Sequence, residues 1–145
     1  MKSGGKPMDR LEKIIKAHPR QSNMDLQAML DCVNACFECS QICTVCADAC
    51  LGEEHIQPLI RCIRLNQDCA DICATTGRML VRLNCPDWAI IRSQLQACTA
   101  ACHKCGNECE LHAQMHEHCK ICLEACREAE ATLKDLLVTQ LEAVS

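Results

Sequence analysis

Apolar and polar positions follow each other along this chain in the alternating three- and four-residue steps of amphipathic helices, and cysteine occupies much of the apolar stripe. In the first run of cysteines the steps are 4, 3, 4, 3 and 4, and related steps return in three later runs. The four runs are Cys32, Cys36, Cys39, Cys43, Cys46 and Cys50; Cys62, Cys69 and Cys73; Cys98, Cys102, Cys105 and Cys109; and Cys119, Cys122 and Cys126. This spacing predicts helices that each carry thiols along one face.

Helix-breaking residues separate the four runs. Gly52 follows the first, Asn84 and Pro86 lie between the second and third, and the His-rich stretch 112–118 precedes the fourth. The predicted helices span about 24–51, 56–83, 87–112 and 115–138, with Asn23, Glu54 and Asp87 near helix starts.

The chain divides into three parts on this pattern. Residues 1–23 form an N-terminal extension, in which Asp9–Ala17 predicts a short amphipathic helix that packs on the outside of the bundle or on a neighbouring subunit. Residues 24–138 form the bundle, and 139–145 form a C-terminal tail.

Four helices with short connections predict an all-α, up-down four-helix bundle whose core is lined by cysteines. At one end, the core positions become an aliphatic plug: Leu26, Met29, Leu80, Leu83, Ile91, Leu95, Leu133 and Leu137. The opposite end gathers Cys50, Cys62, Cys109 and Cys119, and the stripes continue there into His112, Met115 and His116. We expect this end, called the mouth below, to be the entrance. Asn66 takes a core position of the second helix and is expected to orient a His partner near the mouth.

Composition supports a single globular domain with unusual core chemistry. The chain has 145 residues, of which 49% are hydrophobic, 23% are charged and 17 are cysteine, while Phe37 and Trp88 are its only aromatic residues. A net charge of −4, without a basic run or a stacking platform, argues against a nucleic-acid partner. Met1–Arg10 lacks the apolar core of a signal peptide, and no stretch has the length of a membrane span, so we expect a cytoplasmic protein without membrane contact.

In a reducing cytoplasm, clustered cysteines indicate metal chemistry before disulfides, and the odd number prevents complete pairing within one chain. Packing alone does not explain why cysteine occupies these core positions, because Leu or Ile would bury more apolar area at each position. Cysteines three or four residues apart on one helix also have side-by-side Cβ vectors that are poorly placed for disulfides.

Among metals, the pattern fits monovalent copper best. Cu(I) is soft, selects thiolates and accepts two or three ligands, which neighbouring helical thiols supply without wrapping the ion. With bridging thiolates, a one-to-one ratio of Cu(I) to thiolate leaves the core neutral. Zinc or cadmium in tetrathiolate sites would instead stack buried negative charge along the axis, although such a store remains an alternative. The loop-borne cysteine run of ferredoxins is missing, and an iron–sulfur or dithiol redox protein is the second alternative.

The repeated CxxxC pairs on four helices, together with the His-bearing turn before the last helix, resemble the bacterial copper storage proteins, and the missing signal peptide resembles their cytosolic branch. The pairs are Cys32/Cys36, Cys39/Cys43, Cys46/Cys50, Cys69/Cys73, Cys98/Cys102, Cys105/Cys109 and Cys122/Cys126. The resemblance covers about residues 24–138. It implies a four-helix bundle that assembles into homotetramers, binds many Cu(I) ions inside each bundle and takes them in through a His- or Met-lined end.

We therefore predict a non-enzymatic, cytosolic Cu(I) storage and detoxification protein, loaded by a copper chaperone or a small-thiol donor. The predicted ligands are the sixteen striped cysteines with His112 and His116, and Cys85 is excluded because it lies off the core face. Solvated positions are predicted for the remaining histidines and for two charged clusters: His18, His55, His103, His118, Glu53/Glu54 and Arg127/Glu128/Glu130. Apolar side chains that face outward, compatible with subunit packing, are predicted at Ile42, Val45, Ile63, Ile72 and Ile90.

Overall fold

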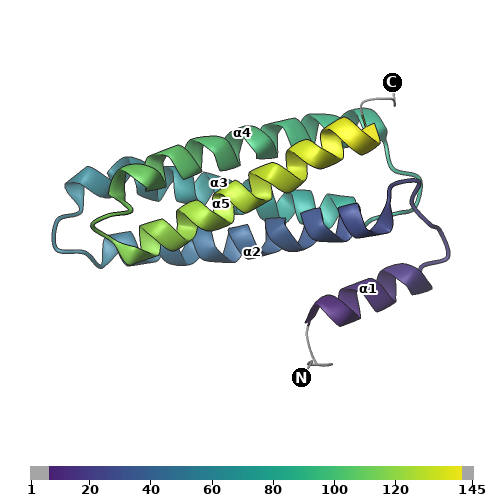
Figure 1. Ribbon diagram of the computed structural model, residues 1–145, viewed down its shortest axis with the longest axis horizontal. Helices are drawn as coiled ribbons and strands as arrows, with labels where there is room; N and C mark the ends of the chain where they lie inside the picture. Colours follow the sequence, from purple (N-terminus) through teal and green to yellow (C-terminus); the bar gives the residue numbers. More distant parts are fainter. Residues whose placement is uncertain (1–6, 142–145) are drawn as a thin grey trace.

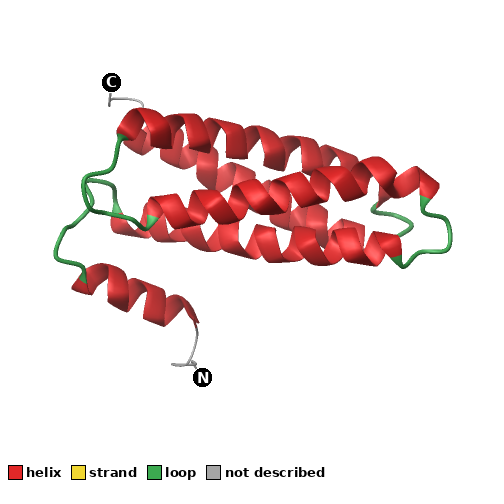
Figure 2. Cartoon of the chain, turned by 180° about the vertical axis from the view of Figure 1, so that it is seen from behind, coloured by secondary structure: helices red, strands yellow, loops and turns green. Residues whose placement is uncertain are grey.

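The computed structural model describes residues 7–141, and these residues form helices joined by loops (Figures 1 and 2). The elements are α1 (Pro7–Ala17), α2 (Leu26–Leu51), the 3₁₀ turn η1 (Gln57–Leu59), α3 (Ile60–Leu80), α4 (Trp88–His112), α5 (Glu117–Leu136) and the π-helical turn η2 (Leu137–Leu141). Helices α2 to α5 lie alongside one another and alternate in direction, with short loops at both ends (Figure 1). The predicted all-α four-helix bundle is confirmed.

Side-chain capping explains where α2 and α4 begin. Asp25, not Asn23, caps α2, because its Oδ2 accepts a hydrogen bond from the Ala28 backbone N–H at 3.0 Å. Asp87 caps α4 as predicted, with its Oδ1 accepting from the backbone N–H groups of Ala89 and Ile90.

The start of α3 differs more from the prediction. Glu54 does not cap it, and the 3₁₀ turn η1, with Pro58 in its first positions, precedes the helix, which begins at Ile60 and has no side-chain cap. At the other end of the chain, helical structure continues through η2 to Leu141, so the predicted tail at 139–145 is helical over its first residues. Its last four residues, and residues 1–6 of the predicted N-terminal extension, lie outside the described part of the chain.

The aliphatic plug closes the end of the bundle where the α2 N-terminus and the α5 C-terminus meet. Its buried members are Met29, Leu80, Leu83, Ile91, Leu95, Leu133, Leu136 and Leu141. Leu26 and Leu137, predicted as members, are only partly buried and pack against this cluster. Leu136 takes the inward position because the stripe steps three residues from Leu133, and the wider π turn then carries Leu141 onto the core.

Helix α1 lies outside the four-helix bundle (Figure 1). It attaches through one side: Ile15 is 4% exposed and Leu11 packs against the core cluster, whereas Ile14 is 67% exposed. The short amphipathic helix is therefore present and packs on the outside of the bundle. No helix within residues 7–141 is both long and apolar enough to cross a bilayer.

Glu130 corrects the prediction that the charged cluster on α5 is wholly solvated. The residue is only 6% exposed, and it links α5 to α4 through His103 Nδ1 at 3.0 Å, while Lys134 Nζ on its own helix lies 2.9 Å away. Burial raises the pKa of this carboxyl, but the hydrogen bonds and charges of Lys134 and His103 outweigh it and bring the pKa below its ordinary value of 4.5.

We expect Glu130→Gln to lower the free energy of unfolding by about 1–2 kcal/mol at neutral pH, since a buried charge-assisted contact is lost. A carboxyl whose pKa is lower in the folded state stabilises the fold above the unfolded value of 4.5 and loses that effect as pH falls through the folded value. The difference between wild type and variant, measured by urea unfolding of the apo protein, should therefore shrink in acid. Glu128→Gln, at an exposed neighbouring site, is the control, and a pH-independent difference would contradict the assignment.

Candidate metal centre

The sixteen striped cysteines all lie inside the bundle, each no more than 1% exposed, and all are free thiols. Cys85 is different: it is exposed in the α3–α4 loop at the plug end, with a backbone φ of 55°. The structure thus gathers every predicted cysteine ligand into one core and leaves out the cysteine that the sequence excluded.

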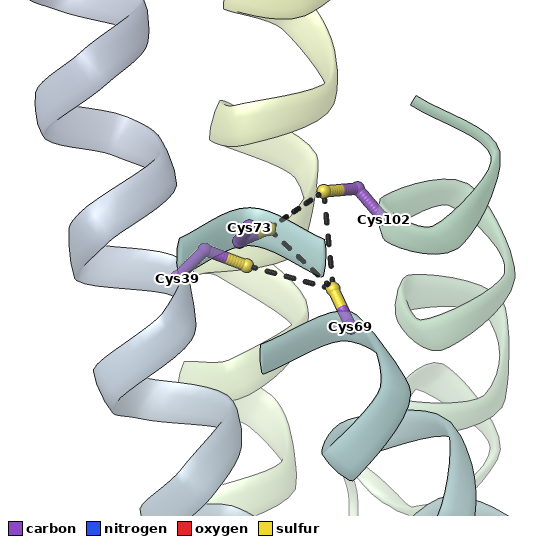
Figure 3. A group of neighbouring side chains, drawn as sticks. All are labelled: Cys39, Cys69, Cys73 and Cys102. Carbon is purple, nitrogen blue, oxygen red and sulfur yellow. Dashed lines mark hydrogen bonds between the residues drawn. The ribbon is translucent and has the colours of Figure 1, made fainter. Parts of the chain in front are cut away.

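Sulfur atoms from different helices approach to contact distance along the axis. Cys73 on α3 lies 3.5 Å from Cys102 and 3.7 Å from Cys98, both on α4. Figure 3 shows Cys39, Cys69, Cys73 and Cys102 pointing toward one another from α2, α3 and α4, and their sulfur atoms lie within 4.8 Å of one another. These distances bring several soft donor atoms within reach of one small ion.

Groups of this kind overlap along the bundle. Two further groups of four thiols are Cys39, Cys43, Cys69 and Cys126, and Cys43, Cys105, Cys122 and Cys126. Nearer the mouth lie the groups Cys46, Cys109 and Cys122, and Cys46, Cys50, His118 and Cys119. Because neighbouring groups share members, such as Cys39 and Cys43, the thiols form a continuous lining, called the thiol tube below, and not a set of separate centres.

Asn66 is fully buried in the thiol tube, where it meets thiols and not the His partner that we expected. Its Oδ1 accepts from Cys105 at 2.9 Å and from Cys122 at 3.1 Å, and its Nδ2 donates to Cys62 at 3.6 Å. The expectation was wrong because Asn66 points into the bundle farther from the mouth than the histidines do. Its neighbours there are sulfur atoms of α4 and α5. Its carbonyl oxygen adds a hard donor to an otherwise soft lining.

His118 is a candidate metal ligand that the sequence reasoning missed. Its Nδ1 lies 3.4 Å from the sulfur of Cys46 and 3.6 Å from that of Cys119, so the ring faces the thiol tube and not solvent. The prediction assumed that a neighbour of Cys119 points away from the axis. In the first turn of α5, however, side chains lean toward the helix N-terminus, where no preceding turn blocks the open end of the tube.

The two histidines predicted as ligands lie at the mouth, partly buried, and each ring lies beside a carboxylate. His112 Nε2 lies 3.0 Å from Glu108, and His116 Nδ1 lies 3.2 Å from Glu53. The prediction that Glu53 is a solvated residue was therefore wrong. Met115, in the preceding turn, is 83% exposed.

Crowding of the thiols shifts their pKa values in both directions. Hydrogen bonds with neighbouring thiols, together with burial, raise the pKa of Cys43, Cys73 and Cys109 above the ordinary 9.0. At the mouth, burial is the main cause that raises the pKa of Cys50 to about 11. Cys69 goes the other way, since S–H groups around it favour its thiolate and lower its pKa. Thiols whose pKa is raised therefore outnumber those whose pKa, like that of Cys69, is lowered.

Comparisons with known proteins agree with this geometry. Residues 25–137 match the family of copper storage proteins. The structure of the copper storage protein Ccsp from Streptomyces lividans, loaded with 10 copper equivalents, is similar with a TM-score of 0.86 and 43% identity, over 88% of this chain and 98% of that one. A structure of a cytosolic copper storage protein from the same organism with five coppers gives a TM-score of 0.76 and 47% identity, over 77% and 93%. The uncharacterized cysteine-rich protein YhjQ of Bacillus subtilis is 37% identical over 94 residues, which are 65% of this chain and 82% of its own.

Proposed function

Since the chain belongs to the copper storage protein family, we propose that it stores Cu(I) on the sixteen buried thiols of its bundle, with the mouth as the entrance. The observation that supports this proposal most directly is that neighbouring groups of thiols share cysteines along the bundle. Sulfur atoms 3.5–3.9 Å apart on facing helices suit thiolates that bridge neighbouring Cu(I) ions. A bridged array with one thiolate per ion is electrically neutral, which a dry helical core tolerates.

The proposed ligands are the sixteen cysteines together with His118, whose Nδ1 faces Cys46 and Cys119. His112 and His116 are proposed to act at entry, since they lie at the mouth beside carboxylates. Storage needs no catalytic cycle, and we assign none. A copper chaperone or a small-thiol complex is the proposed donor.

We also propose a cytoplasmic location, supported by the similar Streptomyces lividans protein described as cytosolic. A homotetramer, implied by the resemblance, would use outward apolar side chains. Val45 and Ile90 are exposed, with 63% and 60% of their surfaces accessible, and suit such packing. Ile42, Ile63 and Ile72 are instead partly buried against the core of their own bundle, so they contribute less outward surface than was predicted.

An anaerobic Cu(I) titration of the reduced protein, in competition with a chromophoric chelator, tests the proposal. We expect saturation on the order of one Cu(I) per buried thiol. Saturation after one or two ions would instead indicate a transfer, sensing or redox site. Zinc or cadmium storage would appear as fewer ions than thiols in tetrahedral sites, with Cu(I) bound no more tightly.

The variant Cys39→Ala/Cys43→Ala makes the titration specific to the tube. These two thiols belong to three of the overlapping groups. We expect a loss of about two or more Cu(I) ions per chain, because each bridging thiolate serves neighbouring ions. Cys85→Ala, which removes the exposed thiol, is the matched control and should retain full capacity. Equal capacities for the two variants would contradict storage in the tube.

A further inference from the structure

One carboxylate oxygen contacts two histidines at the mouth. Glu53 Oε2 lies 2.9 Å from His118 Nε2 and 3.2 Å from His116 Nδ1. Glu53 follows Gly52, the C-cap of α2, and its backbone N–H donates to the carbonyl of Cys50 at 3.2 Å. The carboxylate is therefore fixed relative to the last thiol of α2 and reaches across to the first residues of α5.

The contacts of Glu53 determine where the histidine protons lie. An ionised carboxylate only accepts hydrogen bonds, so the imidazole nitrogen that faces it carries the hydrogen. A neutral imidazole has one N–H, and its other nitrogen is then a free electron pair. His118 thus carries its hydrogen on Nε2 and leaves Nδ1 bare, whereas His116 carries its hydrogen on Nδ1 and leaves Nε2 bare.

The bare nitrogen of His118 is the one that faces the tube, 3.4 Å from the sulfur of Cys46. The ring of His116 stacks on that of His118 with centroids 5.4 Å apart, so a second bare nitrogen belongs to the adjacent ring. A carboxylate that fixes the tautomer and orientation of a ligating histidine acts on the metal site without touching the metal.

We propose that Glu53 is a positioning residue for copper entry, which holds His116 and His118 in opposite tautomers so that two neighbouring rings each offer a bare nitrogen at the mouth. This inference rests on the proposed storage function. A purely structural link between α2 and α5 would not require the two rings to differ in tautomer.

The tautomers are read directly in the reduced apo protein, without copper. Long-range ¹H–¹⁵N NMR in mildly alkaline buffer distinguishes the protonated from the bare nitrogen in each ring. We expect Nε2–H for His118 and Nδ1–H for His116. In Glu53→Ala, His116 should lose its Nδ1–H form, because an unconstrained imidazole favours hydrogen on Nε2. Glu53→Gln retains an acceptor oxygen and should keep part of the wild-type pattern.

Glu54→Ala is the matched control, since it removes a carboxylate from the exposed adjacent position. Its tautomers should be those of the wild type. In stopped-flow transfer of Cu(I) from a chromophoric chelator, Glu53→Ala should take up copper about tenfold more slowly, which corresponds to the lower end of the losses in affinity or activity that follow removal of the partner of a ligating histidine. Glu54→Ala should load at the wild-type rate, and both variants should reach the wild-type capacity.

The inference is overturned if His116 and His118 share one tautomer in the wild type, if Glu53→Ala keeps opposite tautomers, or if its uptake rate is unchanged. These outcomes differ from a failure of the storage function, in which the wild type itself would take up no more than one or two ions. Far-UV circular dichroism of each variant confirms that the helices are retained.

Discussion

Loading of the apo protein with Cu(I) is expected to release about one proton for each protonated thiol that becomes a ligand, and the affinity for ions bound by those thiols should fall about tenfold per unit decrease in pH. The cause is the protonation of these thiols before copper binds. Hydrogen bonds with neighbouring thiols, and then burial, raise the pKa of Cys43, Cys73 and Cys109, and burial raises that of Cys50 to about 11, so these thiols are protonated at neutral pH. Each ion must displace a proton to obtain a thiolate, and acid therefore competes with copper.

Proton release is measured anaerobically in weak buffer with a pH indicator, and the affinities are measured by chelator competition at several pH values. Cys85→Ala serves as the control, because the exposed thiol contributes nothing to the buried lining. Loading without proton release, or an affinity that does not change with pH, would be inconsistent with ligation by displaced thiol protons.

Removal of copper from the loaded protein is expected to produce the second large effect, a fall in the free energy of unfolding that exceeds the stability of the apo fold itself. Each site filled at about 100 times its dissociation constant adds about 2.7 kcal/mol when only the folded state binds. Several filled sites therefore exceed the roughly 5–15 kcal/mol that is typical of a domain. Binding of Cu(I) to unfolded thiols reduces the gain, but an unfolded chain does not hold thiols from four helices together.

The apo protein should nevertheless remain helical, because the aliphatic plug and the packed thiols form a core without metal. Guanidinium unfolding followed by far-UV circular dichroism, with and without copper, measures both the gain in stability from copper and the helicity of the apo protein. Cys39→Ala/Cys43→Ala should show a smaller copper-dependent shift than Cys85→Ala. An apo chain without helicity would mean that the metal drives folding, as in proteins whose chain wraps around the ion.

The bundle and its buried thiols were predictable because a strict heptad stripe has one physical solution in a compact chain, as the positions of Cys32 to Cys50 illustrate. Helix starts were predictable only where a side chain caps the helix. Asp87 was identified, whereas the start of α3 depends on the turn around Pro58 and was misplaced.

The polar parts of the site were less predictable, because they depend on contacts between segments far apart in the sequence. Glu53 meets His118 across 65 positions, and nothing in either local pattern indicates the pair. Periodicity correctly placed Asn66 in the core but did not identify its partners on α4 and α5. Glu130 was misassigned for the same reason, since its burial depends on packing against α4.

The thiol tube also determines how the copper capacity of such a bundle depends on the length of its helices. A further heptad in each of four helices lengthens a bundle by about 10.5 Å and adds about eight inward positions. The number of ions that the bundle can hold therefore increases in proportion to helix length. Each added layer of inward residues leaves the contacts within the existing layers unchanged. A hollow shell, in contrast, changes the curvature of its whole wall when it is enlarged. In a bundle of the present kind, the smallest step that adds a complete layer is therefore one further heptad in each of the four helices.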